Sequence, residues 1–105
     1  MAQFDVFENP NAAQRDGFPY LVVLQSHQLD QFSTRLVMPL ARVPRAPPSL
    51  PRRLTLAVVV HGERLYLAAH LCAPLPAKIL KRRVVSLRDQ ADAFRDALDA
   101  VISGV

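Results

Sequence analysis

The 105-residue sequence predicts a mainly β fold of the α+β class, in which a small antiparallel barrel or strongly bent sheet is followed by one C-terminal helix. Short apolar segments separated by turn residues fill the chain up to residue 85, which is typical of antiparallel strands. Residues 61–63 (HGE) divide two of these segments as a hairpin turn would. Only residues 86–104 carry a sustained helical pattern, and the chain length fits a single domain over residues 1–105.

Two strands are predicted in the first quarter of the chain. Residues 3–8 (QFDVFE) alternate so that Phe4 and Val6 share one face. Residues 20–26 (YLVVLQS) are nearly all apolar, which indicates a strand covered on both faces. The intervening ENPNAAQRDGFP contains an Asn-Pro and an Asp-Gly pair, so it is predicted to be a loop.

A third strand is predicted at residues 34–41 (TRLVMPLA). Pro39 has no amide donor, and it therefore indicates a sheet edge or a bulge near the end of this strand. Residues 42–53 (RVPRAPPSLPRR) contain four prolines, which fix the backbone and remove hydrogen-bond donors. This segment is predicted to be a stiff, exposed, basic loop.

A hairpin is predicted around Gly62, which adopts positive φ at low cost. It joins strands at residues 54–60 (LTLAVVV) and 64–71 (RLYLAAHL). Residues 73–77 (APLPA) contain two prolines and are predicted to interrupt the strands. Residues 78–85 (KILKRRVV) are predicted to form a further short strand with basic faces.

The helix predicted at residues 86–104 has both of its end signals. Ser86 can cap the first turn with Asp89 three residues later, and Gly104 provides a C-terminal stop. One apolar stripe follows the helical period: Leu87, Ala91, Phe94, Leu98, Val101 and Ile102. Because the stripe continues into the last turn, we expect the helix to end in an apolar surface.

The net charge of +4 is unevenly distributed along the chain. Residues 35–88 contain eleven Arg and Lys against Glu63 alone, a net charge of +10, whereas residues 1–34 and 89–105 each carry −3. A basic middle attracts polyanions, either nucleic acid or an acidic protein segment, and a solvated basic surface is the simpler alternative. The aromatic share of 7% without any Trp offers few platforms for stacking bases, which disfavours direct nucleic-acid binding.

The sequence contains no recognisable catalytic or metal-binding set. His27, His61 and His70 lack metal-ligand spacing, and His61 is expected to be solvated at the hairpin tip. The single cysteine, Cys72, excludes an internal disulfide and is expected to be a buried small apolar residue. The helical acidic residues are expected to solvate the outer face of the helix: Asp89, Asp92, Asp96 and Asp99. The sequence has only three glycines and no glycine-rich phosphate-binding loop. Taken together, these features lead us to expect a protein that is not an enzyme and that has no metal and no cofactor.

The sequence also lacks membrane and export signals. No segment reaches the roughly 18–20 apolar residues that cross a bilayer. The first ten residues (MAQFDVFENP) have no basic cluster followed by a hydrophobic segment. We therefore expect a cytoplasmic protein without a membrane partner.

Several of these segments together resemble the CcdB family, toxins of plasmid and chromosomal toxin–antitoxin modules that poison bacterial DNA gyrase. The resemblance spans nearly the whole chain and depends on the order and spacing of its matching residues rather than on any single piece. These residues are Gln3, Phe4, Val6, Gln25, Ser26, Asp30, Arg35, Pro39, Leu40, Leu75, Pro76, Val84, Leu87, Ala97, Leu98 and Gly104.

The resemblance implies an SH3-like barrel with a small additional sheet and a C-terminal helix, assembled as a two-fold homodimer in the bacterial cytoplasm. It also implies noncovalent action. The dimer enters the cavity of the dimeric gyrase A subunit and traps the enzyme with its DNA cleaved, so DNA is involved only indirectly. The end of each C-terminal helix makes the decisive contacts, which accounts for the apolar last turn. The alternative is that this turn packs at the dimer seam.

The gyrase-binding residues implied by the resemblance are Leu29, Asp99, Ile102, Ser103, Gly104 and Val105. The family ending Phe-Trp-Gly-Ile corresponds to Ile102-Ser103-Gly104-Val105, so Gly104 is kept and Ser103 stands in place of the tryptophan. Leu29 matches an apolar contact residue, and Asp99 replaces an asparagine. An aromatic anchor at an interface contributes ~2 kcal/mol or more, so the serine predicts weaker binding.

The second partner implied by the resemblance is a cognate antitoxin with a disordered, acidic C-terminal tail. The basic middle of the chain suits such a tail, because complementary charge speeds encounter and offsets ordering entropy. The predicted attractors lie in the proline-rich loop: Arg42, Arg45, Arg52 and Arg53.

Three functions are thus open at the level of the sequence. The first is a gyrase-poisoning toxin neutralised by its antitoxin. The second is a degenerate family member that keeps the dimer and antitoxin binding, with a co-repressor role, but has lost gyrase poisoning. The third is an SH3-like nucleic-acid-binding module that uses the basic middle.

Overall fold

The computed structural model of the chain describes residues 1–26, 32–43 and 56–103. Its strands are β1 (Asp5–Glu8), β2 (Tyr20–Val23), β3 (Thr34–Ala41), β4 (Ala57–Val60), β5 (Glu63–Leu67), β6 (Ala73–Pro76) and β7 (Arg83–Ser86). The α-helix is α1 (Ala91–Ser103), and short 3-10 turns occur at η1 (Ala12–Gln14), η4 (Ala69–Leu71), η5 (Ala77–Ile79) and η6 (Arg88–Gln90).

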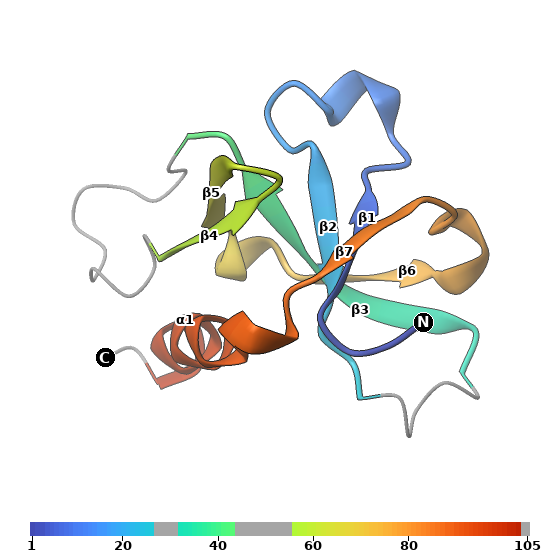
Figure 1. Ribbon diagram of the computed structural model, residues 1–105. Helices are drawn as coiled ribbons and strands as arrows, with labels where there is room; N and C mark the ends of the chain where they lie inside the picture. Colours follow the sequence, from blue (N-terminus) through green and yellow to red (C-terminus); the bar gives the residue numbers. More distant parts are fainter. Residues whose placement is uncertain (27–31, 44–55, 104–105) are drawn as a thin grey trace.

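The strands form one curled antiparallel sheet in the order β4-β5-β3-β2-β1-β7, with β6 pairing to β3 outside this path. The sheet bends into a half-barrel, and α1 lies against one end of it beside β4 and β5 (Figure 1). The predicted fold class, a small bent antiparallel sheet with one C-terminal helix, is therefore confirmed. In the described part of the chain, no helix is long and apolar enough to cross a membrane.

The longest strand, β3, holds the two parts of the sheet together. Its first half, residues 34–37, pairs with β6, and its last residues, Leu40 and Ala41, pair with β5. Pro39 lies where the partner on this side changes, opposite Leu21 of β2. The expectation of a sheet edge or bulge at Pro39 is wrong: the strand is internal, and the missing amide donor falls at the gap between two partners, where no ladder bond is required.

The segment APLPA forms β6 instead of the predicted interruption. Pro74 and Pro76 pair opposite Leu36 and Thr34, so both prolines occupy alternate positions on one side of the strand. Alternate residues direct their amide positions to the same side, so two prolines in this spacing leave the ladder with β3 intact. The next segment was also predicted incorrectly, because residues 77–79 form the turn η5 and the strand begins only at Arg83.

The described residues form two apolar clusters. The larger lies between the sheet and α1, and its buried members include Phe4, Val6, Met38, Leu65 and Phe94. The smaller lies on the other face of β2 and β3: Phe7, Leu21, Val23, Val37 and Leu80. β2 is thus covered on both faces, as its continuous apolar run predicted.

The helix begins later than predicted. Ser86 is the last residue of β7, and its Oγ accepts a hydrogen bond from the Arg88 amide at 3.3 Å, at the start of η6 rather than of α1. On α1 the fully covered positions are Phe94, Ala97 and Ala100. The predicted stripe packs on the larger cluster at Leu87, Ala91, Phe94 and Leu98. In the last turn Ile102 faces solvent, so the helix ends in an apolar surface as expected.

Candidate functional site

The last turn of α1 presents apolar side chains to solvent. Val101 is 40% exposed and Ile102 is 81% exposed, and both follow directly after the buried Ala100. The helix lies at one end of the half-barrel, and its final turn is directed away from the sheet (Figure 1). We call Val101 and Ile102 the helix end. An isoleucine exposed to this degree contributes little to folding, and most of its apolar surface is available to a partner.

The other residues of the implied gyrase-binding set are only partly described by the structure. Asp99 is exposed one turn before the helix end, and Ser103 is the final residue of α1. Leu29, Gly104 and Val105 lie outside the described residues. The structure therefore brings Asp99 and Ile102 to the same end of one helix and does not address the remaining three positions.

A second candidate surface is an apolar groove of about 470 Å³ on the opposite side of the sheet from α1. Its floor comes from β2 and β3 through Leu21, Val37 and Pro39. One wall comes from the β1–β2 loop, and the other comes from η4, β6 and η5, including Leu71, Ala73, Leu75 and Ile79. Leu71 is 42% exposed, so the groove offers apolar surface to a partner.

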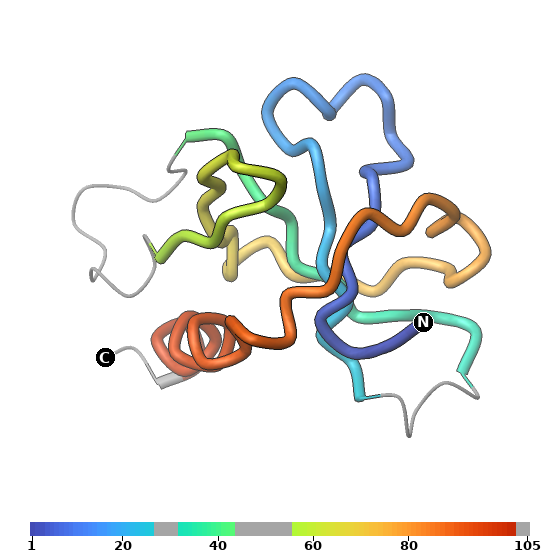
Figure 2. Tube along the Cα trace, in the orientation of Figure 1, coloured from blue at the N-terminus to red at the C-terminus, as the bar shows by residue number. Residues whose placement is uncertain are grey.

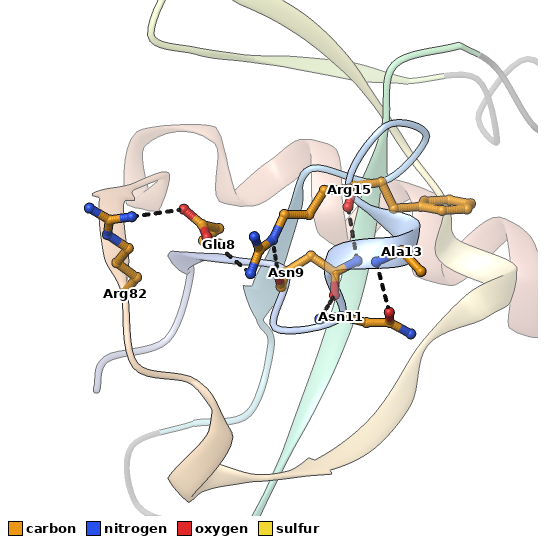
Figure 3. Close-up of polar contacts among 7 residues, drawn as sticks. Glu8, Asn9, Asn11, Ala13, Arg15 and Arg82 are labelled. Atoms are coloured by element: carbon orange, nitrogen blue, oxygen red, sulfur yellow. Dashed lines mark hydrogen bonds and ion pairs between the residues drawn. The ribbon is translucent and has the colours of Figure 1, made fainter.

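Basic residues flank one end of this groove. Pro10 and Ile79 line both the groove and an adjoining hollow that is also lined by Glu8, Arg15, Lys81 and Arg82. Glu8 lies between two guanidinium groups, with Arg15 Nη2 at 3.2 Å and Arg82 Nη1 at 3.5 Å (Figure 3). One carboxylate among three cations leaves a positive surface. We call Arg15, Lys81 and Arg82 the basic rim.

The loop that carries Arg15 is organised by Asn9. The Asn9 side chain donates to the Phe18 carbonyl at 2.9 Å and accepts from the Asn11 amide at 3.0 Å, and Asn9 is 4% exposed. The Arg15 Nε donates to the Asn9 carbonyl at 2.7 Å, and Asn11 in turn accepts from the Ala13 amide (Figure 3). These bonds satisfy the polar groups of a buried asparagine and hold Arg15 at the rim.

The predicted antitoxin attractors are described only at Arg42. Arg42 lines a hollow together with Glu8, Arg15 and Arg82, so it extends the basic rim. Its guanidinium also forms an ion pair with Glu63, which reduces the charge available to a partner. Arg45, Arg52 and Arg53 lie outside the described residues.

No group of three or more His, Cys, Asp or Glu within the described residues is arranged to hold a metal ion. His61 is exposed at the hairpin tip with a φ of 49°, and His70 is exposed on η4, whereas His27 lies outside the described residues. Cys72 is half-buried rather than fully buried, and it packs against the larger cluster. Burial raises the pKa of the Cys72 thiol to about 11, which keeps it protonated at neutral pH and disfavours a nucleophilic role.

The sequence pattern did not single out the basic rim. Arg15 lies in an acidic segment, so segment charge concealed it, and Lys81 and Arg82 were assigned to a strand that does not form there. The run Lys81-Arg82-Arg83 was a visible signal. That run could not reveal the third cation of the rim, Arg15, because Arg15 lies in the loop between β1 and β2, in a distant part of the chain.

The model of the family described as CcdB protein matches residues 3–104 of the 105-residue chain. No curated protein is significantly similar to the chain.

Proposed function

The chain belongs to the CcdB family of toxins from toxin–antitoxin modules, and from this premise we propose that it binds the gyrase A subunit noncovalently and traps gyrase on cleaved DNA. Toxins of this family act without catalysis, and the half-buried, protonated Cys72 is consistent with that mode. Binding would be a matter of apolar surface and shape, since no reacting group is required.

The observation that carries the proposal is the exposure of the helix end. Ile102 keeps 81% of its surface open to solvent at the terminus of a helix whose preceding turns are anchored by Phe94 and Ala97. A rigid helix that presents an apolar side chain is well suited to insert into a pocket of another protein, because little conformational entropy is lost on binding. A homodimer would present two such ends, as a two-fold symmetric target requires.

We further propose that the antitoxin binds in the apolar groove with its acidic residues toward the basic rim. The groove supplies apolar surface through Leu71, Leu75 and Ile79, and the rim supplies positive charge through Arg15 and Arg82. A disordered acidic segment with interspersed apolar residues would match both. The attractors predicted in the proline-rich loop would then add long-range steering rather than the principal contacts.

The proposal is tested by inducible expression of the intact chain and of a chain lacking Ser103, Gly104 and Val105. The intact chain is expected to arrest growth and accumulate cleaved DNA, and co-expression of the antitoxin is expected to prevent both. The shortened chain is expected to be inactive yet still to bind the antitoxin, because the last buried residue of α1, Ala100, precedes the deleted residues in the chain. Full toxicity of the shortened chain would contradict the proposal.

A second function is favoured by Ser103, which stands where the family has a tryptophan. Without that anchor, the chain would keep the fold, the dimer and antitoxin binding and would act as a co-repressor. The same expression experiment separates the two functions. Absence of growth arrest together with normal antitoxin binding would identify the co-repressor.

A further inference from the structure

Phe4 combines a left-handed backbone with a buried aromatic side chain. Its φ is 68°, a region that residues with a Cβ rarely adopt, and among the described non-glycine residues only His61 shares it. His61 lies at an exposed hairpin tip, where positive φ belongs to the turn. Phe4 is 5% exposed at the entry to β1. A strained conformation inside a fold persists only where surrounding contacts hold it.

The backbone of Phe4 joins two segments that are distant in sequence. Its amide donates to the Val23 carbonyl at 2.6 Å, and its carbonyl accepts from the Leu87 amide at 2.9 Å. Val23 ends β2, and Leu87 immediately precedes the turn η6 that leads into α1. Figure 2 shows the N-terminal segment crossing beside the segment that enters the helix. Phe4 therefore anchors the segment that leads through η6 into α1.

The ring of Phe4 contacts α1 itself. Its centroid lies 5.5 Å from that of Phe94, with 32° between the ring planes, and the Arg95 guanidinium lies 5.9 Å from the Phe4 ring. Phe94 is the one large side chain among the fully covered positions of the helix, since the other two are Ala97 and Ala100. Leu98 packs against the same cluster but is only partly buried. Phe94 and the ring that faces it therefore form the largest fully buried contact that orients the helix.

We propose that Phe4 is the positioning residue of the helix end: it sets both the origin and the orientation of α1, and thereby the direction in which Ile102 points. The inference rests on the function proposed above for that end. Phe94 and Ile102 are eight residues apart, about 12 Å along the helix, so a tilt of about 10° at Phe94 displaces Ile102 by about 2 Å. A shift of this size is enough to spoil insertion into a fitted pocket.

The test is a double-mutant cycle on the full-length protein with Phe4→Leu, Phe94→Leu and both changes together. Leu80→Ala, in the smaller cluster away from α1, is the matched control for general loss of stability. Amide hydrogen exchange is measured for α1 and for β2, and the dissociation rate is measured on purified gyrase A subunit. Each single variant is expected to speed exchange in α1 relative to β2 about tenfold, with little further gain in the double variant. Leu80→Ala, whose side chain packs with Leu21 and Val23 of β2, is expected to speed exchange in β2 rather than in α1, and so not to raise this ratio.

Dissociation from the gyrase A subunit is expected to become about tenfold faster for Phe4→Leu and to stay within about twofold for Leu80→Ala. Equal exchange ratios in Phe4→Leu and Leu80→Ala would overturn the positioning role, whatever gyrase binding shows. Faster exchange without faster dissociation, in a protein whose binding does depend on Ile102, would overturn it as well. If neither Phe4→Leu nor Ile102→Ala alters gyrase binding, the proposed function fails, while the exchange data still decide whether Phe4 orients α1.

Discussion

Replacing Ile102 with alanine tests the helix end at a single side chain. The substitution removes three carbons from a residue that is 81% exposed in the free protein. Burial of one methylene contributes about 0.8 kcal/mol, so full burial of the three carbons would contribute about 2.4 kcal/mol. Only the exposed four fifths can be newly buried by gyrase, which leaves about 2 kcal/mol, or about a thirtyfold weaker dissociation constant.

The same exposure predicts that Ile102→Ala barely alters folding. Surface substitutions of this kind change the free energy of unfolding by about 0.5 kcal/mol or less, so urea unfolding should be nearly unaffected. The control is Val59→Ala on β4, which also removes apolar surface from an exposed position, here 53% exposed. Val59 lies on the face of β4 opposite Val58 and Val60, which pack with Phe94 in the larger cluster. It should leave gyrase binding unchanged.

The assay is equilibrium binding of each variant to the purified gyrase A subunit, paired with gyrase-mediated DNA cleavage. A change of less than about threefold for Ile102→Ala, with unfolding unaltered, would show that gyrase does not cover this side chain. A large loss of stability or of dimer affinity would instead indicate that Ile102 packs at the dimer seam. Either result would refute the reasoning from exposure.

Three further outcomes are expected. Ser103→Trp should strengthen gyrase binding and DNA cleavage by about tenfold or more, the size of effect that an aromatic interface anchor has, because an indole adds a large, rigid contact area. Unchanged cleavage would show that the gyrase pocket does not accept the indole. Arg15→Ser together with Arg82→Ser should slow association with an acidic antitoxin segment, more so at low salt, and identical association rates at both salt concentrations would argue against the basic rim. Burial raises the pKa of the Cys72 thiol to about 11 in the folded chain, so between pH 9 and 11 the unfolded chain releases this proton while the folded chain retains it. The free energy of unfolding should therefore fall as the pH rises through this range. Cys72→Ala should lessen that fall, as measured by urea unfolding.

The sequence alone was sufficient for the fold class, because local patterns carry it. Period-two alternation, the turn at Gly62 and the helical period of the last segment are all properties of neighbouring residues. The third strand was predicted with its observed bounds, Thr34–Ala41. The resemblance to the CcdB family also came from residue order alone, and the family match over residues 3–104 confirms it.

Predictions failed where a partner strand decided the outcome. The two prolines of β6 predicted a break in the strand, because proline has no amide donor. Their alternate spacing places both missing donors on one edge of β6, so the strand still pairs with β3 along its other edge. The internal strand β3 tolerates Pro39 because the neighbouring strand changes from β6 to β5 at that residue, so no amide donor is needed there. Neither arrangement is visible in a single segment, since both depend on which strand lies alongside.

The candidate site divides in the same way. The sequence by itself placed an apolar residue in the last turn of the helix, and it is the tertiary structure that leaves Ile102 uncovered while burying Phe94 and Ala97. The basic rim exists only because the β1–β2 loop brings Arg15 to Glu8 and Arg82, which are far apart along the chain. The orientation of α1 likewise depends on Phe4, whose ring packs against the ring of Phe94 although the two residues lie near opposite ends of the chain. Local pattern specifies which elements form, whereas burial, charge clustering and orientation arise from contacts between elements that the order of residues does not itself reveal.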